Sequence, residues 1–289
     1  MIISLHVADV GARAVPTLLR ARPHPDAVPG LRSAETTLTG AIAAGPPKLH
    51  PGRVALLASW DDDAALDGFL EKHALAERLA DGWHVRLRPI RMSGSWSAMP
   101  VEVAPGTAAD DDQEYGGEQK YGGDQAFREQ ADGEQEYRAP GSRGRGGCER
   151  QVGVAAGPAA TPVAVLTLGQ LRLRRALPFL RANSRAAGRA AADPALLASL
   201  ALARPPRFVS TFSIWQSVDA MRRYAYGSAQ PDHKAAIQAH QRAPFHHEAG
   251  FVRCLPYAAQ GTLDGRDPLA TAGTTTATAI AATHRGEAH

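Results

Sequence analysis

Two histidines seven residues apart are the first feature of this sequence that suggests chemistry. His233 and His240 lie in the stretch 231–242, where Asp232 is a suitable helix N-cap and Pro244 marks the end. On a helix, residues seven apart lie within about 20° of each other, so the two imidazoles share a face. A haem iron needs one neutral imidazole on a rigid element beside an apolar cleft, and the first turn of a helix favours the neutral form. Haem ligation is therefore one interpretation of this stretch.

Other interpretations of the same residues stay open. A helical histidine is more often an ordinary surface or core residue than a ligand. A zinc site built from nearby side chains is conceivable, although their spacing matches no familiar metal motif; these are His233, His240, His246, His247 and Glu248. Hydrolase chemistry is not indicated, because the sequence has no GxSxG, HExxH or P-loop motif and no GxGxxG between a strand and a helix.

The elements that would position these residues occur twice in the chain. Each half opens on an alternating strand and continues into a helix with a similar end, Leu18-Leu19-Arg20-Ala21 in one half and Phe179-Leu180-Arg181-Ala182 in the other. A second strand then closes on tryptophan, Trp60 or Trp215. A helix follows each tryptophan, with caps expected from 61–63 and from Ser217. This ordered repetition predicts an internal duplication.

The two halves also end alike, on a strand that runs into proline. These strands are 83–89 and 250–256, and a glycine stands five residues beyond each proline, at Gly94 and Gly261. Each half thus has the order strand, helix, strand, strand or loop, helix, strand, which is that of a ferredoxin-like unit. We therefore predict an α+β fold in which two ferredoxin-like repeats pair face to face into a dimeric α/β-barrel-type core.

Between the repeats the sequence loses its apolar periodicity. Residues 104–158 are rich in Gly, Glu, Gln, Asp and Arg and cannot bury enough apolar surface to offset their ordering entropy, so a disordered insert is predicted. The chain then divides into a first repeat (1–103), the insert, a second repeat (159–269) and a disordered tail (270–289) rich in Thr and Ala.

Composition and charge exclude several classes of protein. The formal net charge is +3 and no clustered basic face is visible, so nucleic acid is not an expected partner. Cys148 and Cys254 stand alone, without a CxxC, which fits a reducing compartment. The N-terminus has no signal-peptide pattern, and no apolar run approaches the roughly 20 residues that span a bilayer. A cytoplasmic protein is therefore expected.

Several blocks of this sequence resemble the spheroidene monooxygenase family. They are 30–37, the Trp60 segment, 233–237 and the closing run 251–269, in which Gly261-Thr262-Leu263-Asp264-Gly265-Arg266-Asp267-Pro268-Leu269 is the most specific piece. The resemblance covers roughly residues 2–97 and 161–269. The sequence departs from the family pattern at Leu263, where a tryptophan is usual, and this puts the local packing in doubt.

The resemblance implies a haem b enzyme that uses oxygen to introduce hydroxyl and then keto groups into a carotenoid or similar apolar substrate. It implies His233 as the proximal iron ligand, with His240 and His247 as alternatives. Arg32 is then a candidate donor to iron-bound oxygen, and Trp60 and Trp215 are candidate walls of the haem pocket. Because no flavin or iron–sulfur motif is visible, the electrons would come from an external donor.

Two other functions remain open at this point. One keeps the haem but has dehydratase or peroxidase-like activity, and the other is a non-catalytic barrel that binds a small ligand or only dimerises. A carotenoid-like substrate would also favour peripheral contact with a membrane. The segment 172–180 is the nearest candidate for that contact, but we expect an ordinary half-buried helix with Leu173, Leu177 and Leu180 packed into the core.

Overall fold

A computed structural model describes residues 1–43, 48–99, 101–103, 161–226 and 245–270. The elements of the first repeat are β1 (Ile2–Asp9), α1 (Val15–Arg20), β2 (Leu31–Ala41), β3 (Lys48–Trp60), α2 (Asp63–Lys72), α3 (Ala74–Leu79) and β4 (Trp83–Gly94). Those of the second repeat are β5 (Val163–Leu171), a 3₁₀ turn (Leu173–Arg175), α4 (Ala176–Ala192), β6 (Leu196–Arg204), β7 (Phe208–Trp215), α5 (Val218–Tyr226) and β8 (His246–Gln260).

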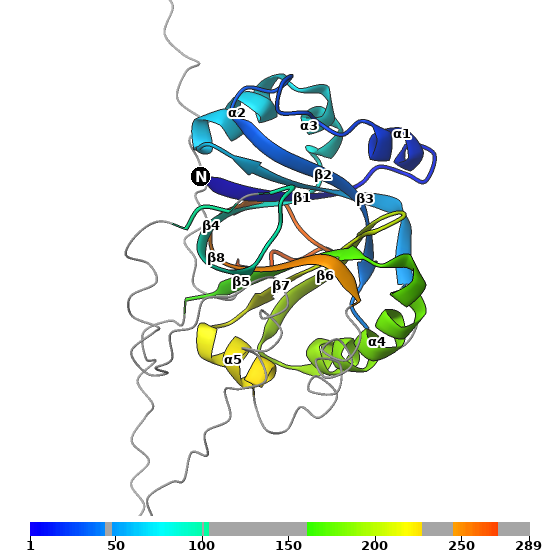
Figure 1. Ribbon diagram of the computed structural model, residues 1–289. Helices are drawn as coiled ribbons and strands as arrows, with labels where there is room; N and C mark the ends of the chain where they lie inside the picture. The colour runs from blue at the N-terminus through cyan, green and yellow to red at the C-terminus, as the bar shows by residue number, and fades with distance from the viewer. Residues whose placement is uncertain (44–47, 100, 104–160, 227–244, 271–289) are drawn as a thin grey trace, which may run out of the picture.

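The eight strands form one closed antiparallel barrel in the order β1-β3-β2-β6-β7-β5-β8-β4. Each repeat contributes a four-stranded sheet with the ferredoxin-like order, and the repeats join where β2 pairs with β6 and β4 pairs with β8. In Figure 1 the two sheets face each other, with α1, α2 and α3 outside the first sheet and α4 and α5 outside the second. The predicted fold class is therefore confirmed. The third and fourth elements of each repeat are both strands, β2 and β3 in the first repeat and β6 and β7 in the second.

The strand registers repeat between the two halves. Trp60 lies opposite Ile2 and Leu31, and Trp215 lies opposite Val163 and Leu196. A β-bulge follows at the same place in both, between Leu31 and Ser33 and between Leu196 and Ala198. The glycines after the last strands also match, since Gly94 has a φ of 78° and Gly261 a φ of 80°. Such agreement in local irregularities confirms the duplication.

Two helix caps follow the sequence prediction, whereas one helix end does not. The Asp62 carboxylate accepts a hydrogen bond from the Ala65 amide at 2.9 Å, and the Ser217 hydroxyl accepts one from the Ala220 amide at 3.1 Å. The expected end of the first helix of the second repeat, at Ala182, is wrong. α4 continues to Ala192, and five of the ten residues beyond Ala182 are alanine and two are arginine, both of which favour a helix.

The barrel interior is a packed core. Alternate apolar residues of all strands but β2 form one buried cluster, whose largest members include Trp83 and Phe212, with ring centroids 6.2 Å apart. The segments after β4 and β8 add Trp96 and Leu263, which occupy equivalent positions in the two repeats. Leu263 is buried in this core, so an apolar side chain fills this place as Trp96 fills the equivalent place in the first repeat.

A glycine at the end of β8 gives a test of this packing. A Cβ at Gly261 would lie 2.1 Å from the carbonyl oxygen of Gly82, and φ is positive. We expect Gly261→Ala to lower the free energy of unfolding by about 2–4 kcal/mol in urea titrations. Gly265→Ala is the matched control, because φ is 75° there but nothing lies within 4 Å, and it should cost only about 1 kcal/mol. Equal costs would contradict the close contact.

The predicted insert 104–158 and tail 270–289 lie outside the described residues, apart from Ala270. Within the part of the chain that is described, no helix is long and apolar enough to cross a membrane.

Candidate functional site

The two repeats differ most in the layer between each sheet and its helices. In the first repeat this layer is a cluster of sixteen buried apolar residues beneath α1, α2 and α3. In the second repeat the corresponding cluster, among the described residues, has three: Val163, Trp215 and Met221. We call the second of these the thin layer. Residues 227–244 and the side chains of 182–186 lie outside this comparison. Within the described residues the strand registers are the same, so the two layers differ in the side chains that their strands carry.

Short, half-buried side chains cover the helix-facing side of the second sheet. Thr167 of β5 lies opposite Thr211 of β7, and their hydroxyl oxygens are 2.6 Å apart. The equivalent pair of the first sheet is His6 and Leu56, both of which are buried. Small residues with partial exposure make this face of the second sheet the less filled of the two, and therefore the place where a large apolar group would fit.

A histidine enters the thin layer near the end of β5. The register of β5 and β8 shifts between the pairs Gln170–Glu248 and Leu171–His246, so that one extra residue, His247, is bulged. The His246 ring occupies the space beside Gly169, where a Cβ would lie 2.7 Å from its Cδ2 and 2.8 Å from its Nε2. Its centroid is 5.0 Å from that of Phe179 on α4. His246 is thus buried between the sheet and α4.

The other predicted histidines are placed differently. His247 is exposed, and its Nε2 lies 3.2 Å from a guanidinium nitrogen of Arg207. The bulge exposes His247, one of the two alternative ligands named from the sequence, and places His246 between the sheet and α4. His233 and His240 lie outside the described residues. Within the described ranges, no group of three or more His, Cys, Asp or Glu side chains could hold a metal ion.

The two tryptophans predicted as pocket walls lie in different layers. Trp215 closes the thin layer at the end opposite His246, where its ring stacks on Tyr224 at 4.8 Å and its Nε1 donates to the Ser213 hydroxyl at 3.0 Å. Burial raises the pKa of Tyr224 to about 12. Trp60 is buried in the first repeat, where it contacts Phe69. Of the two, Trp215 is therefore the one that borders the thin layer.

Arg32, the predicted donor to bound oxygen, lies in an ion-paired group of the first repeat. Its Nε donates to Asp61 at 2.7 Å and its Nη1 to Glu102 at 2.8 Å. The hydrogen bond to Asp61, followed by that to Glu102, raises the pKa of Arg32. The structure thus places this guanidinium between two carboxylates and not in the thin layer.

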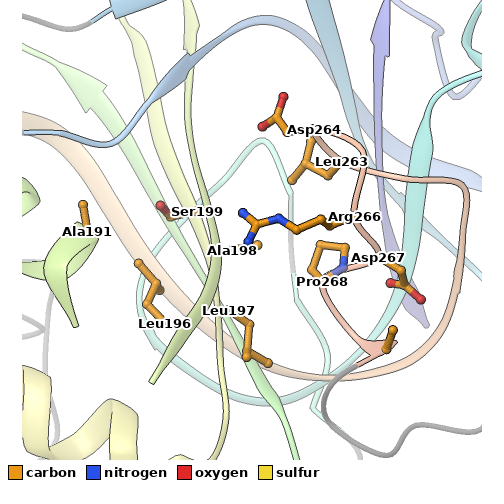
Figure 2. A pocket seen from close by; sticks show the side chains of 11 residues that line it. Ala191, Leu196, Leu197, Ala198, Ser199, Leu263, Asp264, Arg266, Asp267 and Pro268 are labelled. Atoms are coloured by element: carbon orange, nitrogen blue, oxygen red, sulfur yellow. The ribbon is translucent and has the colours of Figure 1, made fainter. Parts of the chain in front are cut away.

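A pocket of about 560 Å³ lies beside the first half of β6, within the roughly 300–1,000 Å³ that small-molecule sites occupy. β2 pairs with β6 only along Ala201–Ala203, and the pocket lies beyond that pairing, against 196–199. Its other walls are Ala191 of α4 and the segment after β8; Figure 2 shows the Arg266 side chain extending toward Ala198. Leu196 lines the pocket and also packs on the cluster of the thin layer, so the two adjoin.

Sequence reasoning named His246 only as a possible zinc ligand, and it missed Gly169 and the thin layer itself. A residue-by-residue alignment of the two repeats could have indicated the layer, since Thr167 and Thr211 stand where His6 and Leu56 stand in the first repeat. Nothing in the sequence marks the bulge that selects His246.

Searches of family models and of curated proteins find no match for this chain. Solved structures with a similar arrangement include an aldoxime dehydratase, OxdRE, in complex with butyraldoxime, which is 16% identical over 88% of this chain and 79% of its own, with a TM-score of 0.40. Another is the haem-degrading enzyme LmHde of Listeria monocytogenes, 11% identical over 86% and 98% of the chains, with a TM-score of 0.25. A third is a ferredoxin-fold protein from Listeria monocytogenes related to antibiotic biosynthesis monooxygenases, 12% identical over 87% and 94%, with a TM-score of 0.26. At this similarity they do not identify the reaction of this chain.

Proposed function

We propose that this protein is a haem-dependent monooxygenase that introduces hydroxyl or keto oxygen into a carotenoid-like apolar substrate, with haem b bound in the thin layer. The observation that supports this site most directly is the row of short, half-buried side chains on the helix-facing side of the second sheet, where the described residues include three buried apolar side chains against sixteen in the first layer. A sheet face of short side chains suits a large, flat, apolar group.

The described residues fit such a group. Thr167, Thr211 and Val165 give the second sheet a floor of short side chains. Phe179 and the buried His246 stand at one end of the layer, and Trp215 stands at the other. Aromatic and apolar walls of this kind exclude water, which a site for oxidative chemistry requires.

The proposed iron ligand comes from the resemblance to the spheroidene monooxygenase family, and the structure offers one alternative histidine. We assign the ligand role to His233, because it matches the histidine of the family block. His246 is the buried histidine that the described part of the thin layer offers in its place. A bound haem supplies the oxidising chemistry, while the protein holds a neutral imidazole, keeps the site dry and orients the substrate.

Substrate and electrons reach the site from outside in this proposal. The pocket beside β6 adjoins the thin layer at Leu196, and its lining combines apolar residues, among them Leu197, Leu263 and Pro268, with the charged side chains of Asp264, Arg266 and Asp267. We assign the apolar part of this lining to the hydrocarbon chain of the substrate. Each hydroxylation by O₂ consumes two electrons, which we assign to an external donor.

The test is an absorption spectrum of protein expressed with added haem precursor, compared with His233→Ala, His246→Ala and His247→Ala. We expect a Soret band in the parent protein that is lost in His233→Ala and kept in His247→Ala, the exposed neighbour that serves as control. Loss of the band in His246→Ala alone would move the ligand to His246. The absence of a band in the parent protein would overturn the haem proposal.

The reaction is tested separately, by incubating the haem-loaded protein with a carotenoid, a chemical reductant and O₂. Chromatography should show hydroxylated and keto products, and labelled O₂ should appear in them. A Soret band without such products would overturn the proposed reaction and leave the haem site.

A further inference from the structure

Large exposed apolar side chains gather on α4 and on the 3₁₀ turn (Leu173–Arg175) that leads into it. Leu173, Leu177 and Leu180 are 50%, 66% and 36% exposed, and the only other large exposed apolar residue of the described chain is Leu49, at 47%. The expectation that the three leucines pack into the core is therefore wrong. Single exposed leucines are ordinary, but three on one short segment form a patch.

These leucines lie on the side of α4 that faces away from the sheet. Spacings of four and three residues place Leu173, Leu177 and Leu180 on one face of a helical segment. Phe179 points to the other side, where its ring contacts those of Phe245 and His246. In Figure 1 α4 lies on the outer side of the second sheet, so the leucine stripe faces outward from the barrel.

The charge around the stripe has one sign. Residues 161–192 contain six arginines and no aspartate or glutamate. Arg174 and Arg181, seven residues apart, form a second stripe beside the leucines, and Arg175 is exposed in the same turn as Leu173. Arginine side chains can lay their apolar stems along an apolar surface and keep the guanidinium in a polar region.

We propose that this leucine and arginine face of α4 docks on an anionic lipid surface. A helix that lies in a membrane interface needs exposed apolar residues on one side and basic residues beside them, and both are present. A second copy of the same face would bring arginine against arginine, which opposes a symmetric dimer through this surface. The inference does not rest on the proposed function, although a lipid-dissolved substrate would be delivered next to the thin layer that α4 covers.

The experiment is co-sedimentation of the full-length protein with vesicles of phosphatidylcholine alone or mixed with phosphatidylglycerol. We expect binding to the anionic vesicles that weakens as salt is added and is weak or absent on neutral ones. Leu177→Glu should lower the partition coefficient at least ten-fold, and Arg174→Gln about five-fold. Leu49→Glu is the control, because Leu49 is the other large exposed leucine of the described chain and lies on β3, away from α4; this variant should bind like the parent protein.

Thermal unfolding followed by circular dichroism checks that the variants are folded. Leu49, Arg174 and Leu177 are all exposed, so their variants should unfold at the same temperature as the parent protein. The proposal is overturned if the parent protein ignores anionic vesicles or binds neutral ones equally. It is also overturned if Leu49→Glu weakens binding as much as Leu177→Glu. Light scattering that shows a dimer broken by Leu177→Glu, with no vesicle binding, would instead assign the face to a second copy.

Discussion

Replacing Trp60 by alanine should lower the free energy of unfolding by about 3–5 kcal/mol, and Trp215→Ala should cost about half as much. The two tryptophans end equivalent strands, β3 and β7. Trp60 is one of the sixteen buried residues of the first layer, and its ring centroid is 5.0 Å from that of Phe69. Its Nε1 donates a hydrogen bond to the Ser4 hydroxyl at 2.9 Å. Removing the Trp60 ring leaves a cavity, and the surrounding buried side chains cannot move into it because they are packed against one another. Urea denaturation followed by circular dichroism measures both costs.

Trp215 has fewer buried neighbours, so the layer around it can relax. It packs on Val163 and Met221 and stacks on Tyr224, which is only partly buried. Haem should raise the stability of the parent protein and of Trp60→Ala by similar amounts, and that of Trp215→Ala by less. Equal losses for the two variants without haem would show that the layers are equally well packed. The main support for a ligand site in the second layer would then disappear.

The barrel was predictable because the chain repeats its irregular features as well as its pattern of apolar residues. Trp60 and Trp215 mark the ends of matching strands, and Gly94 and Gly261 mark positive φ angles at matching turns. Such residues are required by local geometry, which the sequence records directly.

The orientation of α4 was not predictable in the same way. A stripe of leucines at helical spacing indicates an amphipathic helix, but it does not show which side faces the sheet. In the second repeat Phe179 faces the sheet and the leucines face out. The leucines that the sequence pattern assigned to the core therefore add no apolar cover to the second sheet.

The choice between His246 and His247 depends on pairing between distant strands. Simple alternation along β8 from Phe251 places His247 toward the helices, but the register shift opposite Leu171 reverses the first residues of the strand. A bulge of this kind arises from how β5 and β8 fit together over a separation of about eighty residues. No local pattern records it.

The buried pair of His6 and Ser4, which lies beneath the helices of the first repeat, should make the free energy of unfolding fall in acid. His6 is fully buried, and burial, together with the neighbouring His84 and Arg86, lowers the pKa of His6 from 6.5 to about 3. Burial and Arg86 also lower the pKa of His84, whose ring lies 5.1 Å from that of His6. Because Trp60 donates to the Ser4 hydroxyl, that hydroxyl can donate its own hydrogen to His6 Nε2, 3.1 Å away, which accepts when the ring is neutral.

The sign of the effect follows from where the protons bind. Between pH 6.5 and about 3 the unfolded chain protonates residue 6 while the folded chain does not, so stability is full above pH 6.5 and falls as the pH is lowered. Below pH 6 the contribution of His6 lowers the free energy of unfolding by up to about 1.4 kcal/mol for each pH unit. His6→Gln removes the titrating group and keeps a polar side chain beside Ser4, so its unfolding free energy should change less between pH 7 and pH 5 than that of the parent protein. His24→Gln, at an exposed position, should follow the parent curve. If His6→Gln also follows the parent curve, His6 keeps an ordinary pKa in the folded protein and the acid sensitivity must come from other groups.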